Sequence, residues 1–194
     1  MDRSRRIEAL TLEFAKLYGA PPTDWFRAPG RVDLMGSHTD YNDGFVATMT
    51  VDRDTWIAIR PRNDRRVRIA TLNLPGSADF SLETIERDPE VPWTDYVRGA
   101  AQVLKDEGVQ IEGFDGLLHS TVPFGSGLSS SAAIESVVLL AFAAVSGVEI
   151  EPVRLALLGQ RVENEFVGLA CGILDQYTSV LGTAGHALLL DCRE

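Results

Sequence analysis

The chain has 194 residues, 45% of them hydrophobic, and 28 acidic against 18 basic side chains give it a net charge of −10. This apolar content excludes a disordered or collagen-like chain, and the acidic balance disfavours nucleic acid as a partner. The longest apolar run, Val137 to Val145, is too short to cross a membrane, so no membrane association is expected.

The compartment can be inferred from the start of the chain and from its cysteines. The first ten residues are rich in charge and lack the apolar stretch of a secretory signal. Cys171 and Cys192 stand alone, without the paired spacing of a zinc site or a disulfide scaffold. We therefore expect a cytoplasmic protein.

The N-terminal part of the chain predicts one helix followed by strands. Apolar residues at helical spacing indicate an amphipathic helix from Ile7 to Leu17, which Gly19 ends. Alternation of Trp56 and Ala58 with their neighbours is typical of half-buried antiparallel strands. The basic stretch 60–68 is expected in a hairpin and the acidic stretch 76–92 in a surface connection. The predicted strands begin near Trp25 and cover 45–51, 55–60 and 66–72.

The C-terminal part predicts longer helices. The segment 130–146 is apolar almost all round, so it should be a deeply buried helix. Helices and strands are mixed without regular alternation, which favours an α+β fold with helices packed on a mixed, mostly antiparallel sheet. The predicted helices cover 95–106, 130–146, 152–166 and 175–181, and the predicted strands cover 114–122 and 187–191.

The segment 123–133, PFGSGLSSSAA, joins a predicted strand to the buried helix. Glycines let a ligand approach the backbone, and the free amides of a helix N-terminus favour an anion such as phosphate. An ordinary glycine turn with serine capping is the structural alternative. Leu128 and Ser129 stand where a Walker loop needs lysine, and Ser130 replaces the third glycine of a dinucleotide fingerprint, so both of those motifs are excluded.

The segment 27–44, RAPGRVDLMGSHTDYNDG, gathers arginine, histidine and carboxylates in one glycine-containing stretch. Asp40 could accept hydrogen bonds from sugar hydroxyls, and Arg31 could neutralise developing phosphoryl charge. A solvated hairpin turning at 42–44 is the alternative, and it leaves Gly30–Arg31 and 36–38 unexplained.

A third candidate segment contains Glu163 and the sequence CGILDQY at 171–177. Asp175 stands at the start of an apolar helix. From the residues alone, an aspartate in that place is more often a helix cap than a catalytic group.

In this order and spacing, the three segments resemble the galactokinases of the GHMP kinase superfamily. The stretch 29–44 resembles the galactokinase signature, 125–133 the phosphate loop, and 171–176 the loop that carries the catalytic aspartate. The resemblance runs from Phe26 to Cys192. It implies that residues 1–194 form a single GHMP-kinase N-terminal domain, similar to a domain of a ribosomal protein, and that the C-terminal domain which would dock on it is absent.

The resemblance also implies ATP and Mg²⁺ as cofactors, with phosphorylation of the anomeric hydroxyl of galactose to galactose 1-phosphate. Without the second domain, we expect this chain alone to be inactive. The implied site residues are Asp175 and Arg31 for catalysis; Ser37, His38, Asp40 and Gly172 for the sugar; Gly125, Ser126, Gly127, Leu128, Ser129, Ser130 and Ser131 for ATP; and Ser131 and Glu163 for the metal.

Two departures from the family pattern concern the sugar. Ser37 stands where galactokinases usually have glutamate, and Asp33 stands where they usually have asparagine. A kinase for a related sugar, such as galacturonate or L-arabinose, is therefore an alternative. Some relatives are non-catalytic galactose sensors, which lose part of the serine and alanine run that is complete here at 129–133.

Overall fold

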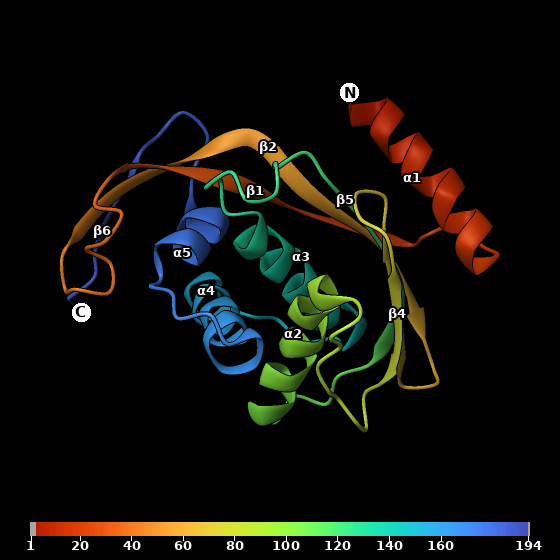
Figure 1. Cartoon of the computed structure of the whole chain (residues 1–194). Helices are drawn as coiled ribbons and strands as arrows, with labels where there is room; N and C mark the ends of the chain where they lie inside the picture. Colours follow the sequence, from red (N-terminus) through yellow and green to blue (C-terminus); the bar gives the residue numbers. More distant parts are fainter. Residues whose placement is uncertain (1–2, 194) are drawn as a thin grey trace.

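The computed structural model describes residues 3–193, in which one curved sheet carries helices on both faces (Figure 1). The strand order is β1-β2-β5-β3-β4, with β6 paired to β2. Strand β3 runs parallel to β5 and the other described pairs are antiparallel, which confirms the predicted α+β fold. The strands are β1 (Asp24–Met35), β2 (Phe45–Arg62), β3 (Arg66–Thr71), β4 (Ser77–Ser81), β5 (Gly113–Ser120) and β6 (Leu188–Asp191).

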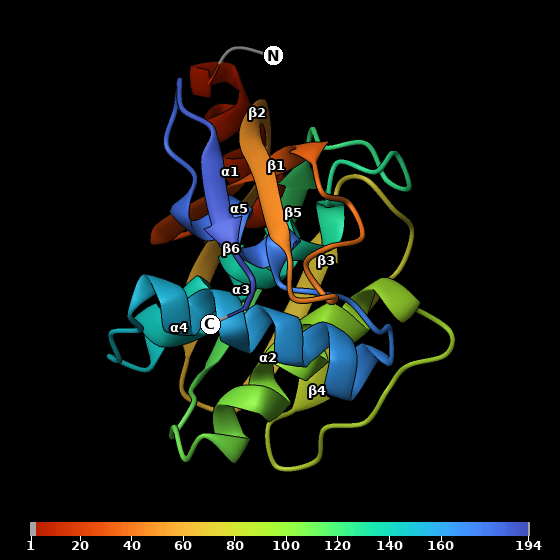
Figure 2. The ribbon, with the colours of Figure 1, turned by 90° about the vertical axis from the view of Figure 1, so that its left-hand side faces the viewer.

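Four helices, α2 to α5, fill the concave face of the sheet, and α1 lies on the opposite face (Figures 1 and 2). In the part of the chain described, no helix is both long and apolar enough to cross a membrane. The helices are α1 (Arg3–Tyr18), the 3-10 turn η1 (Pro92–Thr94), α2 (Asp95–Asp106), α3 (Ser130–Val145), α4 (Pro152–Arg161), the π-helical turn η2 (Val162–Val167) and α5 (Leu174–Leu181).

Helix α3 is the centre of the main core. It packs against β1 and β2 on one side and against α2, α4 and α5 on the others. Most of its apolar residues are buried, as its sequence predicted, but Leu140 and Val145 are only half-buried and Ala144 is exposed. Because the helix is enclosed, its N-terminus has a fixed position at the end of β5. Its core contacts include Val137, Val138, Leu139 and Phe142, with Phe114 of β5 packed edge-on against Phe142.

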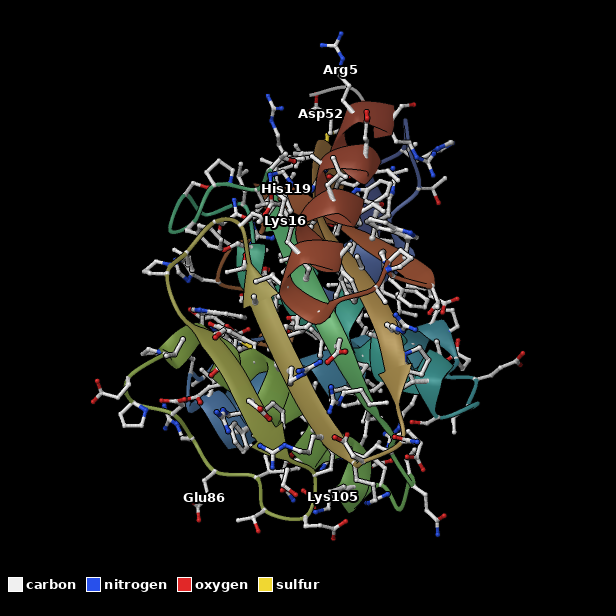
Figure 3. All side chains as sticks on the ribbon, turned by 90° about the vertical axis from the view of Figure 1, so that its right-hand side faces the viewer. Arg5, Lys16, Asp52, Glu86, Lys105 and His119 are labelled. Atoms are coloured by element: carbon white, nitrogen blue, oxygen red, sulfur yellow. The ribbon has the colours of Figure 1, made fainter. Side chains whose placement is uncertain are left out.

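Helix α1 covers the outer face of the sheet, where Figure 3 shows it lying across the strands beside His119. Leu10 and Phe14 pack there on Trp56 and Ala58. The expectation of half-buried strands was therefore wrong for this part of β2, because α1 buries the face that would otherwise meet solvent.

The sheet differs from the predicted strands in two further ways. The runs 45–51 and 55–60 form the single strand β2, which pairs with β1 on both sides of a register shift: Pro29 faces Asp54 and Arg31 faces Thr50, so residues 51–53 of β2 bulge out of the pairing. The stretch 60–68 is not a paired hairpin, because β5 is inserted between β2 and β3.

The connection 76–92 contains the unpredicted strand β4. Ala78 and Phe80 point into the core while their neighbours are exposed, so the strand has the usual alternation over only five residues. The predicted helix 152–166 is divided at Arg161, where the α-helix α4 gives way to the wider turn η2.

Candidate active site

The loop between β5 and α3 is exposed at Gly125 and Gly127. These glycines have φ of +67° and +74°, and an added Cβ would meet nothing within 4 Å. Because a side chain would have space at both positions, the left-handed backbone, and not crowding, explains why these residues are glycines. The loop delivers the chain to the first turn of α3, whose amides lack intrahelical partners and face the anion-attracting end of the helix dipole.

Ser129 directs its side chain away from α3. Its φ of +54° is unusual for a residue other than glycine, and its hydroxyl does not cap the helix. The hydroxyl donates instead to Oδ2 of Asp175 on α5. Serine capping, the structural alternative for this loop, is therefore not what Ser129 does.

Asp175 is also held by Arg31 of β1. The Arg31 guanidinium donates to Asp175 Oδ1 through Nε at 2.8 Å and Nη2 at 2.5 Å. Its Nη1 donates to the carbonyl oxygen of Gly127 at 2.6 Å. Both oxygens of Asp175 thus have donors, and the carboxylate keeps 27% of its side-chain surface exposed. Asp175 does not cap α5 in this arrangement, in which its side chain turns toward the phosphate loop.

Close packing brings β1 against that loop. The amide of Arg31 donates to the carbonyl of Leu128 at 3.1 Å. A Cβ at Gly30 would lie 2.7 Å from the same oxygen, so a larger residue would push the strand and the loop apart.

Asp40 meets the segment before α5. The Leu174 amide donates to Asp40 Oδ2 at 3.4 Å. A Cβ at Gly172 would lie only 1.8 Å from that oxygen, so glycine is required for Asp40 to occupy this place. Asp40 and Leu174, 134 residues apart in sequence, therefore bring the signature segment and the Asp175 segment into direct contact.

The remaining candidates in the signature segment bond locally. The Ser37 hydroxyl donates to Oδ2 of Asp33. His38 Nδ1 lies 2.6 Å from the hydroxyl of Tyr41, and both His38 and Ser37 are exposed. Among residues 3–193, the side chains of Ser37 and His38 form hydrogen bonds only with other residues of the signature segment, so no hydrogen bond connects either of them to Asp175.

Glu163 is buried beneath the start of α3. Its Oε2 accepts from Gln176 Nε2 at 3.1 Å and from the Cys171 thiol at 3.4 Å. Burial raises the pKa of Glu163, and the nearby Cys171 and Ser131 oppose that rise. Ser131 and Glu163, predicted as a pair, are therefore neighbours.

Glu135 was not anticipated by the sequence interpretation. It is fully buried, and Gln176 Nε2 donates to its Oε2 at 3.0 Å. Burial and the neighbouring Glu163 raise the pKa of Glu135 well above its ordinary value. Glu135 is the single charged residue of the segment 130–146, and that was the signal that could have revealed it, whereas Gln176 carried no such signal.

Comparison with known proteins assigns the family. The family model described as "Galactokinase galactose-binding signature" matches residues 12–61, and "GHMP kinases N terminal domain" matches residues 95–183. The galactokinase of Chloroflexus aggregans is 49% identical over 97% of this chain and 48% of its own length. That of Roseiflexus sp. is 48% identical over 93% of this chain and 46% of its own length.

Two solved structures show the same fold. Lactococcus lactis galactokinase complexed with galactose matches with a TM-score of 0.92 and 35% identity, over 97% of this chain and 50% of that chain. Methanococcus jannaschii mevalonate kinase matches with a TM-score of 0.72 and 22% identity, over 88% of this chain and 54% of that chain. The second similarity concerns the fold alone.

The sheet, its helical layer and the family model show that the chain carries the N-terminal domain of a GHMP kinase. Within that class, the signature match and the sequence identity make it a member of the galactokinase family. The chain spans about half the length of the curated relatives that it matches.

Proposed function

We propose that the protein containing this chain transfers the γ-phosphoryl group of ATP to the anomeric hydroxyl of galactose, giving galactose 1-phosphate and ADP. The observation that carries the proposal is the position of Asp175, held by Arg31 and Ser129 beside the glycine loop of α3. The galactose in the L. lactis relative supports the choice of sugar.

In this mechanism the chain mainly positions the two substrates and stabilises the charge of the transferring phosphoryl group. The loop 125–131 would bind the ATP phosphates, with the α3 N-terminus favouring their charge. Asp175 would orient the sugar hydroxyl and take its proton as the new O–P bond forms and the bond from the γ-phosphorus to ADP breaks. Arg31 would stabilise charge on the transferring group, whose transition state is loose.

The residues near α3 fit Mg²⁺, which takes oxygen ligands and usually binds through one or two carboxylates together with phosphates. Glu163 offers a carboxylate and Ser131 a hydroxyl. No cluster of three or more His, Cys, Asp or Glu suited to a metal occurs in the described residues, so the other ligands would come from phosphate and water. When bound, the metal would neutralise phosphate charge.

The sugar would lie against Asp40 and Gly172, with His38 and Ser37 at its edge. Asp40 is the best supported of these, because it already meets the segment that carries Asp175. We also propose that residues 1–194 are the N-terminal one of two domains and that the second closes the cleft. The relatives' greater length supports this. ATP as donor and the free thiols of Cys171 and Cys192 favour the cytoplasm.

A kinase for a sugar altered at carbon 6 is the second candidate. It is favoured by the Ser37–Asp33 hydrogen bond, which leaves a neutral, short side chain where galactokinases usually place glutamate. A non-catalytic sensor is disfavoured, since the arrangement of Arg31, Ser129 and Asp175 is complete.

The deciding experiment follows ATP consumption by the full-length natural protein with galactose, galacturonate and L-arabinose. Turnover that depends on galactose and yields galactose 1-phosphate supports the proposal. A protein that binds galactose but consumes no ATP would instead be a sensor.

A further inference from the structure

A buried amide separates two acids at the centre of the helical layer. Gln176 is 0% exposed, and its Nε2 donates to Glu135 Oε2 at 3.0 Å and to Glu163 Oε2 at 3.1 Å. An amide nitrogen carries two hydrogens, one for each acid. Since the three residues belong to α5, α3 and η2, one side chain joins three elements.

The amide also determines which oxygen of Glu163 remains available. Oε2 already accepts from Gln176 and from Cys171. Oε1 is therefore the oxygen left for an outside ligand. Without the amide, Glu135 would lose this hydrogen bond and Oε2 of Glu163 would keep only the weak thiol donor of Cys171, and a buried acid that loses partners is costly.

Packing from α4 restrains the Gln176 side chain. Gly159 lies over it, and a Cβ added there would stand 3.0 Å from Gln176 Cγ and 3.4 Å from Glu135 Oε2. An alanine there would push the amide aside by a few tenths of an ångström. The side chain is thus held from one side by packing and from the other by two hydrogen bonds.

We propose that Gln176 is a positioning residue, whose amide holds Glu163 with one oxygen free for a divalent cation at the phosphate loop. This inference rests on the proposed phosphoryl transfer. Successive residues of an α-helix point about 100° apart, so α5 can present Asp175 to the loop and Gln176 to the core. One turn of helix therefore sets both the reacting carboxylate and the metal-binding carboxylate.

The test measures Mn²⁺ binding in the presence of ADP with the full-length natural protein, by loss of the electron paramagnetic resonance signal of free Mn²⁺. Gln176→Met keeps the size of the side chain and removes both donors. We expect it to raise the Kd for Mn²⁺ by about 10- to 100-fold, the usual effect of losing a partner of a metal ligand. Turnover should recover as Mg²⁺ is raised.

Two further variants separate positioning from stability. Thr178→Val removes another buried hydroxyl of α5, one bonded to Thr48 and away from the acids, and should leave the Kd for Mn²⁺ unchanged. Gly159→Ala should displace the amide while improving helix propensity, so it should weaken Mn²⁺ binding less than Gln176→Met without lowering the Tm.

An unchanged Kd in Gln176→Met, or equal weakening in Thr178→Val, would overturn the assignment while leaving phosphoryl transfer standing. If Gln176→Met does not fold, Gly159→Ala decides, and an unchanged Kd there also overturns it. Failure of the wild-type protein to bind Mn²⁺ with ADP would instead overturn the proposed function.

Discussion

Replacing Gly172 by alanine tests whether Asp40 has to lie where the structure places it. The new Cβ would stand 1.8 Å from Asp40 Oδ2, whereas ordinary contact begins at 3.4 Å, so the carboxylate has to move by about 1.6 Å. A misplacement of about 1 Å can cost about 10²-fold in rate. We therefore expect kcat/KM for the sugar to fall by at least about 10²-fold, equivalent to about 2.7 kcal/mol.

The assay is steady-state turnover with varied sugar at saturating ATP, using the full-length natural protein. KM for ATP should change little, because Asp40 does not belong to the phosphate loop. Gly182→Ala is the matched control: its Cβ would lie 2.4 Å from Thr50 Cγ2, at the far end of α5. That variant should lower the Tm without changing the KM for the sugar.

A double-mutant cycle identifies the cause. If Gly172→Ala acts by displacing Asp40, it should have little further effect in a protein that already carries Asp40→Ala, because residues in contact are not additive. Full additivity of the two losses, or a Gly172→Ala protein with wild-type kcat/KM, would refute this reasoning.

Four further results are expected. Asp175→Asn should lower kcat by about 10²- to 10⁴-fold while ATP binding, measured by calorimetry, is retained; near-normal turnover would remove Asp175 from catalysis. Ser37→Glu should raise the ratio of kcat/KM for galactose to that for galacturonate or L-arabinose, by an amount corresponding to about 1–3 kcal/mol. An unchanged ratio would show that the side chain at position 37 does not contact the group at carbon 6 of the sugar. The 194-residue chain by itself should show no turnover in a coupled ADP assay, because its reaction cleft would be incomplete, and steady turnover would contradict the two-domain proposal. Burial, and then the Arg6 charge, lower the pKa of His119, so the free energy of unfolding should fall as pH drops below about 6.5, where the unfolded chain binds the extra proton. Urea unfolding at a series of pH values should show a flatter dependence below about pH 6.5 for His119→Gln, and an unaltered dependence would argue against this role of His119.

Local sequence determined most of the helices and the character of the phosphate loop. Periodicity located α2 at the residues where it is found, and the apolar run indicated the burial of α3, because both signals depend on residues close in sequence. The glycines of the loop were likewise readable, since the left-handed backbone at Gly125 and Gly127 is a local requirement. The order and spacing of the three motifs were enough to show the resemblance to galactokinases.

Tertiary structure decided what depended on distant partners. The sequence could not show that β5 enters between β2 and β3, or that α1 buries the outer face of Trp56, because pairing and burial are set by segments far along the chain. It gave Asp175 a capping role on local grounds, whereas Arg31, 144 residues away, turns that carboxylate to the loop. The role of Gln176 depends on the packing of three helical elements, because its amide can bridge two acids only after the fold has brought Glu135 and Glu163 beside it.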